Sequence, residues 1–178
     1  MRAKGGQGLK THGRGVGFGF ILIGLIWAVG ACKSSGSGVL QAKELQTAEG
    51  RTEWEQQEPS MLVTLRTAVE RYKREHSLDA LQDYEKTVRA YVDHGFILYR
   101  GYQAAKLQPP SELATSLEKR TALLMDVADE YIKQGSQAVA EGIASDVIHD
   151  YSDLPVMGPS QRRAERLLQR YRYRKGSC

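Results

Sequence analysis

The sequence contains few of the residues and motifs on which many enzymes rely. Its 178 residues include only four histidines and two cysteines. It has no Gly-rich phosphate-binding loop and no Gly-x-Ser-x-Gly nucleophile elbow. No alternating apolar run of the β-strand type stands out either. These absences argue against enzymes that use those motifs and against a β-rich fold, and we expect a protein that is not an enzyme.

The histidines offer little for metal binding. Asp146 and His149 are three residues apart and would share a helix face, and a carboxylate and a histidine at that spacing can bind a metal. Metal sites in helical bundles use this spacing twice, but the residue three positions before His94 is Tyr91. We therefore expect no metal site and no cofactor.

Acidic residues are absent before Cys32, and this first segment is organised like a secretory signal peptide. An apolar run over residues 16–31 is preceded by four cations: Arg2, Lys4, Lys10 and Arg14. Glycines interrupt the run, which is shorter than the about 20 apolar residues of a transmembrane helix. A basic region, a short apolar region and small residues before a cut are typical of a signal peptide. An uncleaved anchor or an ordinary signal peptide is the alternative.

The end of this segment, residues 28–32, reads Ala-Val-Gly-Ala-Cys. It resembles the lipobox of bacterial lipoproteins, with Val29, Gly30 and Ala31 in the three positions before the cysteine. The resemblance implies transfer of a diacylglycerol to the Cys32 thiol, cleavage before Cys32 and acylation of the new amino group by a fatty acid such as palmitate. Lys33 stands where an Asp would resemble an inner-membrane retention signal. The resemblance therefore implies an outer-membrane protein that faces the periplasm.

Removal of residues 1–31 would change the charge of the chain. The whole sequence has 25 Lys and Arg against 21 Asp and Glu, and the four excess cations all precede Cys32. The remaining chain is formally neutral, so its composition gives no reason to expect a nucleic-acid partner. Cys178 would be left as a lone terminal thiol, either unused or paired between two chains.

The rest of the chain predicts helices. Residues 32–58 contain the Gly- and Ser-rich tether Lys33–Gly38 and a weak helical pattern over 39–50. From residue 59 to 175, apolar residues recur at helical spacing in five stripes, which run over 62–72, 78–107, 113–131, 140–151 and 164–171. Ser60 is a candidate cap for the first stripe, and Gly95 a candidate break or kink in the second. Residues 176–178 form a tail. We expect an all-α domain of antiparallel helical hairpins joined by short turns.

One hairpin carries a more specific pattern. Ala128, Tyr131, Gly135 and Ala140 have the spacing of a tetratricopeptide repeat, and residues 113–155 resemble such a unit. In that family small residues let two paired helices approach each other, and an aromatic residue packs between them. A fainter copy has Ala68, Tyr72 and His76, with Leu81 in place of Ala140. The resemblance implies a right-handed stack, and the alternative is a small helical bundle of another kind.

The last stripe is strongly basic. A single acid, Glu165, stands among six arginines: Arg162, Arg163, Arg166, Arg170, Arg172 and Arg174. Arginines interleaved with Tyr171 and Tyr173 suit a protein partner or an anionic surface. The alternative is a solvated cap over the last apolar groove, since a terminal repeat needs a polar outer face.

The sequence as a whole indicates a protein-interaction scaffold, held by lipid on Cys32 in a bacterial envelope assembly. A stack of helical hairpins offers an extended surface to a protein partner. Two other functions stay open: a cell-envelope enzyme with an unrecognised site, and a structural protein that binds anionic surfaces through its basic helix.

Overall fold

The computed structural model describes residues 44–151 and 158–175, which form helices joined by turns. The helices are α2 (Ala48–Glu55), α3 (Glu58–Glu75), α4 (Leu78–Ala104), α5 (Ser111–Lys133), α6 (Gln137–His149) and α7 (Gly158–Lys175). No strand occurs in these two ranges. The prediction of an all-α fold is confirmed.

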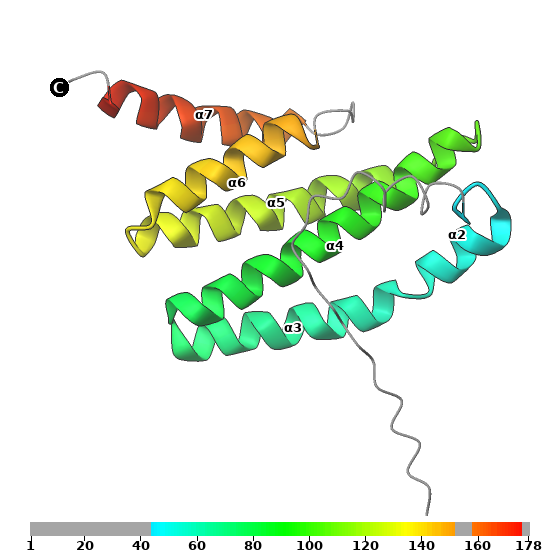
Figure 1. The fold of residues 1–178 in the computed structure, drawn as a ribbon, viewed down its shortest axis with the longest axis horizontal. Coiled ribbons are helices and arrows are strands. Elements are labelled where there is room, and N and C mark those ends of the chain that lie inside the picture. The colour runs from blue at the N-terminus through cyan, green and yellow to red at the C-terminus, as the bar shows by residue number, and fades with distance from the viewer. Residues whose placement is uncertain (1–43, 152–157, 176–178) are drawn as a thin grey trace, which may run out of the picture. The chain divides into compact units, whose positions relative to one another are not determined.

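The helices from α3 to α7 follow one another in space as they do along the chain (Figure 1). From α4 to α7 each helix contacts its predecessor, α7 also contacts α5, and α2 packs against α4. The short turns that join α3 to α4 and α5 to α6 make antiparallel hairpins. The chain divides into two units, residues 1–33 and 34–178. The second unit buries one apolar cluster drawn from α3 to α7 together with Leu45 and Tyr151, as a domain that folds alone must do.

Small residues sit where the paired helices meet. Ala128 and Ala140 are fully buried between α5 and α6, as the predicted pattern requires, and Tyr131 is 1% exposed. The same spacing separates Ala68 from Ala80 in the α3–α4 pair, and both are buried. The counterpart of Ala140 in the first pair is therefore Ala80, not Leu81 as the sequence suggested.

Three local predictions are wrong. Ser60 does not cap α3, because the helix already begins at Glu58 and the Ser60 hydroxyl donates to the Gln57 carbonyl. Leu62, Leu78 and Leu107 are 44%, 44% and 46% exposed and do not belong to the buried stripes. Gly95 does not break α4, which runs unbroken from Leu78 to Ala104.

Gly95 has a packing role instead. A Cβ at this position would lie 2.7 Å from the Leu117 side chain and 2.9 Å from the Arg120 guanidinium. Only glycine lets α5 approach α4 so closely, so this residue brings the two helices together. Gly135 has a φ of 77° just after α5, in the turn to α6, a conformation that favours glycine at the end of a helix.

The predicted tether lies outside the described residues, but residues 44–57, which follow it, pack on the helical unit. Thr47 caps α2 by accepting from the Gly50 N–H, and Leu45 is 1% exposed against α4. A Cβ on Gly101 of α4 would lie 2.6 Å from the Leu45 Cβ, so Leu45 fits only against a glycine. Part of residues 32–58 therefore belongs to the helical core.

Candidate interaction surface

The basic helix α7 has one buried and one exposed face. Ser160, Ala164, Leu167 and Tyr171 are each at most 9% exposed and pack against the rest of the unit. The exposed face carries Arg162, Arg166 and Arg170, which we call the arginine row. Residues four positions apart lie on the same side of a helix, so the row is a continuous strip of positive charge. Within the described ranges, none of its three guanidinium groups makes an ion pair.

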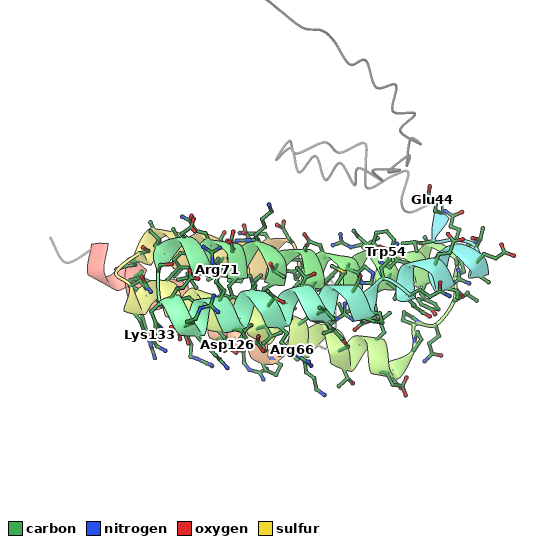
Figure 2. The ribbon with its side chains drawn as sticks, turned by 90° about the horizontal axis from the view of Figure 1, so that it is seen from below. Glu44, Trp54, Arg66, Arg71, Asp126 and Lys133 are labelled. Atoms are coloured by element: carbon green, nitrogen blue, oxygen red, sulfur yellow. The ribbon has the colours of Figure 1, made fainter. Side chains whose placement is uncertain are left out.

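Arg163 is placed differently from the row. Its Nη1 lies 2.7 Å from Asp126 Oδ1 and its Nη2 lies 2.6 Å from Asp129 Oδ2, both on α5 (Asp126 is labelled in Figure 2). Burial alone would lower the pKa of Arg163, but the hydrogen bonds to Asp129 and Asp126 raise it overall. Arg163 therefore clamps α7 to α5, while the neighbouring arginines face solvent.

A second clamp holds the first turn of α7. The backbone N–H and the hydroxyl of Ser160 both donate to Glu118 Oε1 of α5, at 3.0 and 2.7 Å. A carboxylate at this end of a helix is favoured because the unpaired N–H groups there carry partial positive charge. Two clamps along α7 fix its rotation about its own axis, and so they fix the direction in which the arginine row points.

A buried arginine joins three helices at another place in the unit. The side chain of Arg120 on α5 is 2% exposed, and its Nη2 lies 2.6 Å from Glu58 Oε1 at the start of α3. Its Nη1 donates to the Tyr91 carbonyl of α4 at 3.1 Å, and its Nε donates to the Ser116 hydroxyl. The guanidinium also stacks 4.1 Å from the centre of the Tyr91 ring. Each nitrogen of the buried guanidinium therefore has a hydrogen-bond partner, and Arg120 links α5 to α3 and α4.

Trp54 and His94 fasten α2 to α4 (Trp54 is labelled in Figure 2). Their rings stack at 4.9 Å and are 7° from parallel. The Trp54 indole N–H donates to the His94 carbonyl, and His94 Nε2 lies 2.9 Å from the Trp54 carbonyl. Since a carbonyl can only accept, Nε2 carries the proton in this contact. Nδ1 is buried and has no partner among the described residues. Burial, chiefly, lowers the pKa of His94.

Four tyrosines that fall within the predicted apolar stripes are buried: Tyr72, Tyr84, Tyr91 and Tyr131. Most tyrosine hydroxyls also donate to a carboxylate on another helix, in the pairs Tyr72–Glu130, Tyr91–Glu58, Tyr102–Glu55, Tyr131–Glu85 and Tyr151–Asp93. Burial and the facing carboxylate raise the pKa values of Tyr131 and Tyr151. These hydroxyls therefore stay protonated and hold helices together.

Asp146 and His149, the two residues considered for metal binding, lie in different surroundings. Asp146 forms an ion pair with Arg89 of α4, with 2.8 Å between Oδ2 and Nη1. His149 is exposed at the end of α6. Among the residues that the structure describes, no three histidine, cysteine or carboxylate side chains gather closely enough to hold a metal ion.

Several predicted site residues lie outside the described part of the chain. They are Cys32, Cys178 and the side chains of Arg172 and Arg174. No helix within residues 44–151 and 158–175 has the length and apolar character needed to cross a bilayer.

The sequence identified the arginines of α7 but not the acidic residues of α5 that hold this helix in place. The basic composition of α7 pointed to the arginine row, but no local signal marked Glu118, Asp126 or Asp129 as the residues that hold the helix. Trp54 was missed because its stretch has a weak apolar pattern, and Arg120 was missed because nothing local shows that a charged residue of α5 is buried against α3 and α4. Comparison of this chain with protein families, with curated proteins and with solved structures gives no match.

Proposed function

We propose that this protein is a lipid-anchored interaction scaffold of a bacterial envelope. Lipid on Cys32 holds it at the outer membrane, where it faces the periplasm. The observation that carries the proposal is the sequence around Cys32: a basic segment without acids, a short apolar run and small residues directly before the cysteine. A diacylglycerol together with an N-acyl chain anchors a protein more firmly than one chain does.

The helical unit supports the scaffold part of the proposal. Antiparallel hairpins lie side by side from α3 to α7, and such stacks expose long surfaces to partners. The equivalent alanine pairs in α3–α4 and α5–α6 favour a repeat of one helical unit, in keeping with the tetratricopeptide resemblance. Extensive clamps between the helices suit a rigid platform that presents a fixed surface to a protein partner.

The anchor is tested by labelling cells with a fatty-acid analogue. The protein should take up the label, and Cys32→Ser should abolish the uptake and leave the unprocessed precursor, because the thiol accepts the lipid. The matched control is Cys178→Ser, which removes the other cysteine and should leave labelling and processing unchanged. Equal label on the Cys32→Ser variant and the parent would refute the anchor. Capture of the lipidated protein with its neighbours after cross-linking in the native membrane then tests whether it has a protein partner.

A further inference from the structure

We propose that the arginine row of α7 is the surface by which the helical unit rests on anionic lipid head groups of the membrane that carries it. This inference rests on the proposed function, since it assumes that lipid on Cys32 holds the protein at a membrane. The sequence left open whether the basic helix serves as a cap or as a binding surface. The structure assigns a separate role to each side of the helix.

The geometry of the row fits phosphate groups on a surface. Arg162, Arg166 and Arg170 are exposed, and their Cα atoms span about 12 Å along the helix at 1.5 Å per residue. A guanidinium binds phosphate through two parallel N–H groups, which makes arginine a strong ligand for lipid head groups. Glu165 is the only acid on α7, so little negative charge on the helix itself competes with the phosphates.

The two clamps on α7 occupy the nearby carboxylates, so the arginine row is available to bind lipid phosphates. The nearby carboxylates of Asp126 and Asp129 are already paired with Arg163, and Glu118 is held by Ser160. The acids that hold the helix are therefore already engaged by Arg163 and Ser160, and they form no ion pair with the row. Because α7 is already fixed in place, its exposed side can bind a flat bilayer without a further loss of backbone freedom.

The surface beside the row favours lipid over an acidic protein. Stable protein interfaces have an apolar centre in which a few large side chains provide most of the binding energy. Among the residues whose side chains the structure describes, the large apolar ones that are exposed are Leu62, Val63, Leu78, Leu107 and Val139, and none of these lies on α7 between residues 158 and 171. Adsorption to an anionic bilayer needs charge alone and no apolar anchor.

The anchor also keeps the row within reach of a bilayer. From Cys32 to Glu44, where the described helical unit begins, a fully extended chain spans at most about 40 Å. A unit tethered so closely meets the bilayer repeatedly, so even weak adsorption would decide which way the scaffold faces.

Binding to vesicles gives a direct test. Residues 34–178 are mixed with phosphatidylcholine vesicles that contain either no phosphatidylglycerol or about one-third of it, and the bound fraction is measured by co-sedimentation. We expect binding only to the anionic vesicles at low salt, with most of it lost near 0.15 M salt, where screening is strong. Each cation near an anionic surface contributes about a fivefold gain in binding. The triple variant Arg162→Gln, Arg166→Gln, Arg170→Gln should therefore bind on the order of a hundredfold more weakly.

A matched variant controls for net charge. Arg66, Lys73 and Lys119 are also exposed, and they lie on α3 and α5. Their replacement by Gln changes the charge equally and should reduce binding less than fivefold. Far-UV circular dichroism confirms that each variant is folded. If the row variant unfolds, the single change Arg166→Gln replaces it and should weaken binding about fivefold.

Three results would overturn the proposal: no binding to anionic vesicles, full binding by the row variant, or equal losses in the row variant and its control. Binding to soluble polyglutamate but not to vesicles, if it depends on the row, would assign the row to an acidic protein and refute the lipid assignment. The vesicle test uses no lipidated protein, so its failure would leave the anchor on Cys32 standing. Failure of fatty-acid labelling would refute the anchor without changing the vesicle result.

Discussion

Replacing Glu58 should destabilise the helical unit more than replacing Arg120, although either change removes the same ion pair. The two partners differ in burial: the Arg120 side chain is 2% exposed, whereas the Glu58 side chain is 30% exposed. In Glu58→Ala the guanidinium stays buried without a counter-charge, and the Tyr91 hydroxyl also loses its acceptor. In Arg120→Met the remaining carboxylate can be hydrated, and Met can occupy the apolar space beside Leu117.

The structure sets the size of each effect. Leaving a buried charge without its partner costs about 3–5 kcal/mol, so Glu58→Ala should lower the free energy of unfolding by roughly this amount. Arg120→Met loses hydrogen bonds but leaves no buried charge, and we expect a loss of about 1–2 kcal/mol. In a domain of this size, each kcal/mol lowers Tm by roughly 3–5 °C.

Chemical and thermal unfolding of residues 34–178, followed by far-UV circular dichroism, measures these losses. The double variant Glu58→Ala, Arg120→Met should be more stable than the sum of the single losses implies, since no charge is left buried. The coupling between residues in contact is about 0.5–3 kcal/mol. Arg66→Met, at an exposed position on α3, is the control and should change stability by less than about 0.5 kcal/mol. Equal losses in the two single variants, or losses that simply add, would refute the reasoning.

Two further predictions concern the helix contacts. Ala140→Trp should overpack the α5–α6 contact and lower stability by about 1–3 kcal/mol, while the neighbouring exposed Val139→Trp should change it by less than about 0.5 kcal/mol. Identical melting curves for these two variants would show that α5 and α6 do not pack through Ala140. For His94, burial lowers the pKa in the folded state, so the unfolded chain binds more protons as the pH falls below the ordinary value of about 6.5. Its contribution to stability is therefore complete above that pH and declines as the pH falls, by at most about 1.4 kcal/mol per unit. His94→Phe keeps an aromatic ring stacked on Trp54 but removes the titrating group. The denaturant concentration at the midpoint of unfolding should therefore change less with pH between 6.5 and 5 than it does in the parent. An equal change with pH in the two proteins would contradict this role for His94.

The helices were predictable because their signals are local. Apolar residues at helical spacing located each element from α3 to α7, and the end of the stripe at residue 107 lies within a few residues of the end of α4 at Ala104. Local signals failed where a residue's role depends on another helix. Gly95 resembles a helix breaker in the sequence, but α4 continues through it because Leu117 and Arg120 of α5 occupy the space that a side chain would fill. α2 was missed since its apolar content is low: Trp54 fastens it to α4, and Leu45, which also packs on α4, precedes the helix.

By itself, the sequence determined the all-α class, the tyrosine- and alanine-rich core and the basic character of the last helix. It also carries the prediction of lipid on Cys32, because a processing signal is a linear pattern that does not depend on the fold. Only the tertiary structure decided which charges are used inside the unit and which face outward. Arg162 and Arg163 are neighbours of the same type, yet Arg163 pairs with Asp126 and Asp129 while Arg162 lies in the exposed row. The reason is physical: a helix points successive side chains about 100° apart, and what each one meets is set by the helix packed beside it.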